Sequence, residues 1–346
     1  MVRPGAFRPV ASITAALAPL VVIVALVLAS CGGSSTTAAT SPSAMTLPVA
    51  EASQSATPLP TPTVAGTIVF ENVVEPGHGG NGDIYVVNAD GTGLRPLAQA
   101  PGWEDHPSSS PDGRMMVYDV IKEGSDAVRD GTVWVMNADG SGKRQLAKGS
   151  VRGAWATWSP DGKQIAFMRA LLPERFAIFV MNADGSGLKR ATREVKAALG
   201  VPADEFFPAW APNGRILFLR LGDVFAVNPD GSALARLTKN GNIAEFALSP
   251  DGKRIAIQDI MKNRLVVIPA HGGGTPVTLL DNVSDLIPDE HYAALTWTPD
   301  GQALAVASSS YDGYHGSRLY IVNADGSELS AVPGIDNAED PSWRPQ

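Results

Sequence analysis

The stretch TWSPDG, residues 157–162, decides the fold because it recurs along the chain in nearly the same form. The other copies read SSSPDG (108–113), AWAPNG (209–214), ALSPDG (247–252), TWTPDG (296–301) and, at the end of the chain, SWRPQ (342–346). Their six prolines lie 49, 52, 38, 49 and 46 residues apart. A period of this length is typical of the blades of a repeat protein.

A second turn motif lies between these copies. NADG or NPDG follows strand-like runs such as AIFVM (177–181), starting at Asn88, Asn137, Asn182, Asn228 and Asn323. Proline presets the backbone, Asp accepts local hydrogen bonds and Gly takes the left-handed position, so both motifs favour tight hairpins. The runs between them, such as IAFMR (165–169), are apolar on both faces, which is typical of strands buried between neighbouring layers. Each period therefore predicts one blade of four antiparallel strands.

The two ends of the repeat region complete each other. Residues 66–346 begin with TIVFEN, a second strand without a first, and end with PSWRPQ, a first strand without a second. Placed side by side, they make up one blade and leave no long sheet edge exposed. The sequence predicts an all-β, six-bladed propeller over 66–346, closed by the N- and C-terminal strands sharing one blade.

The two turn motifs, recurring in phase over about 280 residues, resemble the PD40, or WD40-like, repeats of TolB-type propellers. The fifth blade departs from the pattern, because IPAHGGGTP (268–276) stands where NADG is expected. The resemblance implies the fold. TolB itself is periplasmic and has an additional α/β domain, for which this chain has no room.

The N-terminal segment predicts export. Arg3 and Arg8 precede an apolar stretch from Val10 to Ala29, and residues 28–31 read LASC, which resembles a bacterial lipobox. The resemblance implies a lipoprotein signal peptide over 1–30 and a lipid on Cys31, the only cysteine. An uncleaved transmembrane anchor is the alternative. Both place the propeller outside the cytoplasmic membrane, on its outer side or in the periplasm.

Residues 31–65 combine this cysteine with a Ser/Thr/Ala/Pro-rich linker, whose composition predicts a disordered tether. Removing residues 1–30 takes away Arg3 and Arg8 and changes the net charge from −8 to −10. An acidic chain without a basic stripe is a poor candidate for nucleic-acid binding. We expect a monomer that contacts the membrane through its lipid.

Function is expected on the face opposite the tight turns, where the long, unequal loops gather. Acids and aromatics stand at the entrances of the innermost strands, so closing the ring would bring them around one mouth. These candidate rim residues are Glu104, Asp105, His106, Trp155, Glu205, Phe207, Glu245, His291, Tyr292, Glu339 and Asp340. Such a rim suits a cation, a metal or a basic peptide.

The leading interpretation is a non-enzymatic binding or scaffold module for an envelope protein, a peptide or a small ligand. No cofactor is predicted, and a divalent metal in the channel mouth stays open, because no histidine pair has ligand spacing. A metal-dependent, carbohydrate-active propeller enzyme is the second alternative, because oligogalacturonate lyases resemble propellers of this repeat type. It predicts that His106, His291 or His315 converge. A structural spacer without a ligand is the third alternative.

Two enzyme-like motifs lack their context. The run GHGGNG (77–82) matches G-x-G-x-x-G, but it links two predicted strands and opens no helix. HGGG (271–274) resembles an oxyanion loop, but no G-x-S-x-G elbow accompanies it. Neither a dinucleotide site nor a hydrolase is therefore predicted.

Overall fold

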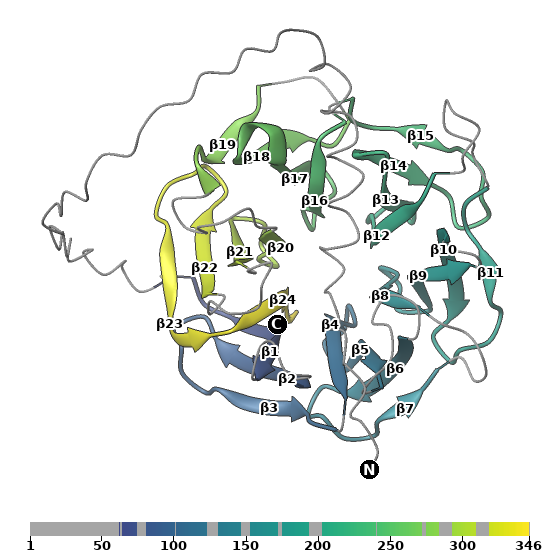
Figure 1. The fold of residues 1–346 in the computed structure, drawn as a ribbon, viewed down its shortest axis with the longest axis horizontal. Helices are drawn as coiled ribbons and strands as arrows, with labels where there is room; N and C mark the ends of the chain where they lie inside the picture. The colour runs from purple at the N-terminus through teal and green to yellow at the C-terminus, as the bar shows by residue number, and fades with distance from the viewer. Residues whose placement is uncertain are drawn as a thin grey trace, which may run out of the picture.

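The computed structural model describes residues 62, 64–74, 81–100, 102–122, 131–146, 153–171, 175–193, 203–239, 241–271, 275–283, 293–308 and 318–345. These residues form a closed ring of six blades, each a four-stranded antiparallel sheet (Figure 1). In this part of the chain the only helix is one short 3₁₀ turn, η1(Ile260–Lys262). None of the described helices is long and apolar enough to cross a membrane.

The blades follow the chain in order, and the strands of each blade are named from the innermost to the outermost. Blade 1 is β24(Ala338–Trp343), β1(Thr67–Val74), β2(Asn81–Asn88) and β3(Arg95–Ala98). Blade 2 is β4(Trp103–Ser109), β5(Met115–Ile121), β6(Thr132–Asn137) and β7(Arg144–Gln145). Blade 3 is β8(Ala154–Trp158), β9(Gln164–Leu171), β10(Arg175–Asn182) and β11(Lys189–Arg190).

Blade 4 is β12(Glu205–Trp210), β13(Ile216–Arg220), β14(Asp223–Val227) and β15(Ala235–Arg236). Blade 5 is β16(Ile243–Leu248), β17(Arg254–Asp259), β18(Arg264–Pro269) and β19(Val277–Leu280). Blade 6 is β20(Ala293–Trp297), β21(Ala303–Ser308), β22(Arg318–Asn323) and β23(Ser330–Asp336). The predicted six-bladed all-β fold is confirmed.

Ring closure follows the prediction in detail. The C-terminal strand β24 pairs antiparallel with the N-terminal strand β1, with Ile68 opposite Trp343 and Glu71 opposite Glu339. Figure 1 shows β24 beside β1 at the centre of the ring. Pairing between the first and last strands of the repeat region therefore holds the propeller closed.

The hydrophobic core is divided into six clusters, one at each interface between adjacent blades. Strand β17 shows why its sequence is apolar without alternation. Ile255 and Ile257 pack against blade 4, whereas Ala256, between them, packs against blade 6. Because both faces of a blade are buried, both sets of side chains must be apolar.

The glycine of the NADG turn is required both by its backbone conformation and by the close approach of a neighbouring blade. Gly140 has φ +89°, and a Cβ there would lie 2.5 Å from the carbonyl oxygen of Leu97, in the outer strand of the preceding blade. Only glycine meets both requirements without strain. In blade 5, which lacks the motif, Ala270 N–H still donates to Lys253 O (2.8 Å), as Ala138 N–H does to Arg114 O in blade 2.

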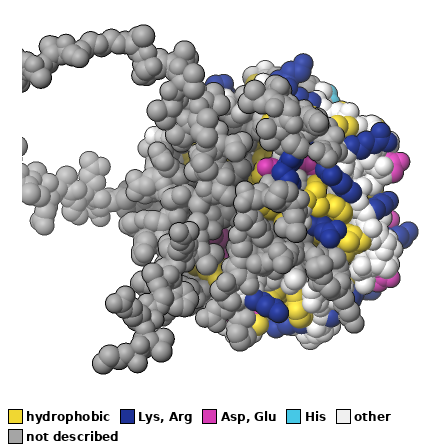
Figure 2. All heavy atoms as spheres, turned by 45° about the vertical axis from the view of Figure 1, so that its right-hand side comes forward, with side chains coloured by type: hydrophobic (Ala, Val, Ile, Leu, Met, Phe, Trp, Pro, Cys, Tyr) yellow, Lys and Arg dark blue, Asp and Glu magenta, His cyan; other side chains and the backbone are white. Residues whose placement is uncertain are grey.

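Five of the six described outer strands are short, with two to four residues, whereas β23 has seven. Basic residues recur in four of them, at Arg95, Arg144, Lys189 and Arg236. Figure 2 shows Lys and Arg side chains spread over the side of the ring that it displays. Charged, short edge strands discourage pairing with other chains.

Candidate functional site

The innermost strands place one residue per blade at the same register, five residues before the turn proline. This position holds Asp340, His106, Trp155, Phe207, Glu245 and Ala294 in blades 1 to 6. It lies in the half of each strand next to the long loops. We call this end of the ring the channel mouth.

Four of these residues have an unusual backbone. His106, Trp155, Phe207 and Asp340 have φ between 44° and 54°, the left-handed region that non-glycine residues seldom adopt. In each case the pairing with the next strand shifts register at that point, which marks a β-bulge. Such conformations cost of order 1–3 kcal/mol each and concentrate at functional sites.

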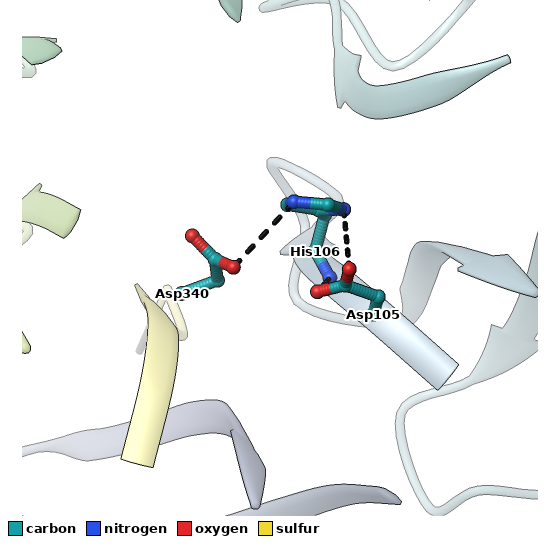
Figure 3. A group of neighbouring side chains, drawn as sticks. All are labelled: Asp105, His106 and Asp340. Carbon is teal, nitrogen blue, oxygen red and sulfur yellow. Dashed lines mark hydrogen bonds and ion pairs between the residues drawn. The ribbon is translucent and has the colours of Figure 1, made fainter. Parts of the chain in front are cut away.

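Acids from two blades surround one imidazole. His106 Nδ1 lies 3.0 Å from Asp119 Oδ2 and 3.2 Å from Asp105 Oδ2, and its Nε2 lies 3.5 Å from Asp340 Oδ2. Figure 3 shows Asp340 and Asp105 reaching His106 from opposite sides. Asp119 also accepts the backbone N–H of Trp155 at 2.6 Å, so this fully buried carboxylate orients two mouth residues.

A second group of acids adjoins the first. Donor atoms of Glu71, Glu339 and Asp340 lie within 4.8 Å of one another, as do those of Asp105, His106 and Asp340. Glu71 is 2% exposed, and its Oε1 has no hydrogen-bond partner among the described residues. We call Glu71, Asp105, His106, Asp119, Glu245, Glu339 and Asp340 the acidic cluster.

Electrostatics in the acidic cluster oppose ionisation of its carboxyls. Burial raises the pKa of Glu339 to about 8, helped by Asp340, and raises that of Glu245 to about 8. Burial and the neighbouring Asp105 also raise the pKa of Glu71 well above its usual range. Repulsion among these groups would be relieved by a cation.

The imidazole responds in the opposite direction. Burial alone would lower the pKa of His106, but Asp105, Asp340 and Asp119 together outweigh it and raise the pKa to about 10. In the described chain the ion pairs of the cluster's carboxylates involve only His106. One protonated imidazole therefore faces six acidic side chains, of which Glu245 and Glu339, each with a pKa of about 8, are mostly protonated at pH 7.

Aromatic rings occupy the neighbouring arc of the mouth. The rings of His106 and Trp155 are 4.1 Å apart between centroids, and Trp155 meets Phe207 edge-on at 5.0 Å. Trp155 and Phe207 remain partly exposed. The mouth thus has an acidic side in blades 1, 2 and 5 and an aromatic side in blades 3 and 4.

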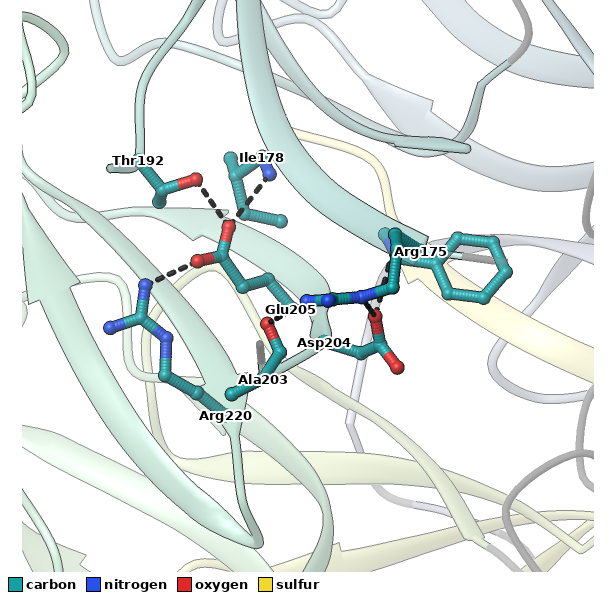
Figure 4. A network of polar contacts seen from close by, with 8 residues as sticks. Arg175, Ile178, Thr192, Ala203, Asp204, Glu205 and Arg220 are labelled. Carbon is teal, nitrogen blue, oxygen red and sulfur yellow. Dashed lines mark hydrogen bonds and ion pairs between the residues drawn. The ribbon is translucent and has the colours of Figure 1, made fainter. Parts of the chain in front are cut away.

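Two predicted rim residues are not on the rim. Glu205 is 1% exposed and pairs with buried Arg220, while Thr192 and the Ile178 N–H donate to its other oxygen (Figure 4). Glu104 is 3% exposed and accepts the Ala100 N–H at 3.2 Å. Glu104 and Glu205 each lie two residues before the bulge residue of their own strand. At that position the side chain points into the space between two blades.

The other residues predicted for the rim fall into two groups. Asp105, His106, Trp155, Phe207, Glu245, Glu339 and Asp340 come together at the mouth. His291 and Tyr292 lie outside the described residues, as do His315 and Cys31. Glu71 and Asp119 are additional members, and each could have been noticed as a lone acid inside an apolar strand.

Comparison with known proteins agrees with this architecture. The model of PD40, the TolB beta propeller domain, matches residues 73–223. This chain contains a TolB-type β-propeller domain. A search of curated proteins gave no significant match.

Solved structures resemble the TolB-type propeller at low sequence identity. TolB from Acinetobacter baumannii is 16% identical with a TM-score of 0.64, over 81% of this chain and 67% of its own. A putative TolB from Agrobacterium tumefaciens is also 16% identical, with a TM-score of 0.56 over 82% and 99%. Kuenenia stuttgartiensis hydrazine synthase is 12% identical, with a TM-score of 0.61 over 81% and 47%. At these identities the likeness concerns the fold alone.

Proposed function

We propose that this TolB-type propeller is a non-catalytic binding module working outside the cytoplasmic membrane, held there by a lipid on Cys31. Its loop face would engage an envelope protein or peptide, and the channel mouth would be the recognition site. A rigid ring that carries six independently variable blades suits recognition. The anchor rests on the sequence pattern of residues 1–31 alone.

The observation that carries the proposal is the excess of carboxyl groups in the acidic cluster, whose pKa values are raised by burial and whose ionised forms a cationic group would favour. Six carboxyl groups share one imidazole, and four strained backbone positions hold that cluster and the adjoining rings in place. Asp340 keeps 31% of its side-chain surface exposed, so a ligand can reach it. A Lys or Arg side chain of a partner would supply the missing positive charge.

Defined peptides test this recognition. A hexapeptide containing two arginines and its counterpart with glutamates would be titrated onto the full chain by calorimetry at two salt concentrations. We expect binding of the basic peptide only, weakened at least tenfold by Asp105→Asn with Asp340→Asn. Glu104→Gln, which changes a buried acid outside the cluster, is the matched control. Equal binding by both peptides would refute the proposal.

A divalent cation is the second candidate occupant, favoured by the unpartnered Oε1 of Glu71. Glu71, Glu339 and Asp340 offer hard oxygen donors of the kind that Ca²⁺ prefers, whereas the group containing His106 would also suit a transition metal. Terbium luminescence would test this site, because Trp103 lies beside Glu71 against Gly82. Emission that Ca²⁺ displaces and Glu71→Gln abolishes would support a metal; no sensitised emission would exclude it.

A binding role is preferred to catalysis for a structural reason as well. Gly82, the last glycine of the G-x-G-x-x-G match, belongs to strand β2 and does not open a helix. The lyase alternative needs several histidines at one point, and His291 and His315 lie outside the described residues. Absence of polygalacturonate cleavage with added Mn²⁺ or Ca²⁺ is the expected result, and cleavage would favour the lyase.

A further inference from the structure

A continuous series of ring contacts runs from the outer part of the loop face to the channel mouth. Phe176 of β10 meets Phe206 at 5.6 Å between centroids, Phe206 meets Phe207 at 6.1 Å, and Phe207 meets Trp155 at 5.0 Å. Trp155 then contacts His106, a member of the acidic cluster, at 4.1 Å. We call Phe176, Phe206, Phe207 and Trp155 the aromatic track.

The aromatic track belongs both to the core and to the surface. Its four rings pack against the cores on either side of blade 4, and all four remain partly exposed. Phe207 and Trp155 are also two of the residues with positive φ, in bulges that redirect their side chains. The backbone is therefore strained at Phe207 and Trp155, the two rings of the track that lie at the mouth.

We propose that the aromatic track and the acidic cluster together bind one linear peptide segment of a partner protein. Apolar or aromatic side chains of that segment lie on the track, and a Lys or Arg side chain enters the acidic cluster. This inference rests on the proposed function and specifies its partner. The acidic cluster adjoins the Trp155 end of the track. The basic residue must therefore lie at the end of the segment that reaches the mouth.

The dimensions fit a short segment. Successive centroid separations of 4.1–6.1 Å limit the path from Phe176 along the track to His106 to about 20 Å, the length of roughly six residues of extended chain. Neighbouring ring planes are tilted by 42° to 81°, so the four rings do not form one flat surface. A peptide is therefore the occupant that the geometry favours.

Selection from a random ten-residue peptide display library on the immobilised full chain tests the pairing. The wild type should enrich peptides in which an aromatic residue lies within six positions of Lys or Arg. Phe176→Leu with Phe206→Leu keeps apolar side chains at both positions, with a smaller volume, and removes two rings. It should lose the aromatic preference and keep the basic one.

The reverse variant and a matched control complete the design. Asp105→Asn with Asp340→Asn should lose the basic preference and keep the aromatic one. Phe225→Leu removes a ring that stacks on Phe218 at 6.0 Å outside the track and should select as the wild type does. Basic peptides without an aromatic preference would overturn the inference while leaving the proposed function standing; a selection without basic residues would overturn both.

Discussion

Glu245 gives the sharpest prediction about the electrostatics of the mouth. Its pKa is raised from 4.5 to about 8, chiefly by burial. Between about pH 4.5 and pH 8 the carboxyl group of Glu245 is protonated in the folded protein and ionised in the unfolded chain. Since the native state then binds more protons, the free energy of unfolding must fall as the pH rises from about 4.5 to 8.

The magnitude follows from the same linkage. One proton corresponds to a slope of about 1.4 kcal/mol per pH unit, so the displacement sets a ceiling of about 5 kcal/mol. Glu245 remains partly exposed, and solvent screening reduces the expected effect to about 2 kcal/mol. Glu245→Gln, which has no proton to release, should therefore be about 2 kcal/mol more stable than the wild type at pH 8 and equal to it at pH 4.5.

Urea unfolding followed by tryptophan fluorescence between pH 4.5 and 8.5 measures this difference. Glu71, Glu339 and His106 give the wild type a slope of the same sign, so the comparison with Glu245→Gln isolates one group. Glu328→Gln, an exposed acid in a tight turn, is the control and should follow the wild type. Parallel curves for the wild type and Glu245→Gln would refute the reasoning.

Three other substitutions test separate parts of the structure. Glu205→Gln leaves the Arg220 guanidinium buried without its counter-charge, so urea unfolding should show a loss of about 3 kcal/mol; a loss below about 1 kcal/mol would contradict the pairing. Asp119→Asn should lower the pKa of His106 from about 10 toward its ordinary value of 6.5 in an NMR titration, and an unchanged pKa would mean that this carboxylate does not hold the ring. Gly140→Ala should lower stability by about 1–3 kcal/mol in thermal unfolding, because its Cβ would meet a carbonyl 2.5 Å away; a neutral result would show that the blades can separate there.

The fold could be predicted from the sequence because each of its tight turns is specified by a few consecutive residues. Pro-Asp-Gly and Asn-x-Asp-Gly each specify a reversal within a few residues, and their alternation fixes four strands per blade. In the turn at Ser110, for example, the hydroxyl donates to Asp112 Oδ1 at 2.7 Å and accepts the Met115 N–H at 2.9 Å. Even the ring closure by β1 and β24 followed from counting strands.

The site was predictable only in part, because side-chain direction depends on residues far away in the sequence. Glu205 and Glu245 look alike as acids at strand entrances, yet one faces Arg220 between blades and the other faces the mouth. The deciding feature is the bulge, and positive φ at residues such as Trp155 is not foreseeable from propensity. Glu71 joined the cluster through the partner of its strand, β24, from the other end of the chain.

Recognition of a cationic partner by the channel mouth underlies both proposals. Site-specific photo-crosslinking in producing cells is its decisive test, with the crosslinker at Phe207 in the mouth or at Leu234, a residue 41% exposed near the opposite face. We expect a protein adduct from position 207 that disappears when Asp105→Asn and Asp340→Asn are added, and none from position 234. An adduct only from position 234, or one from position 207 that survives the loss of both acids, would contradict this recognition.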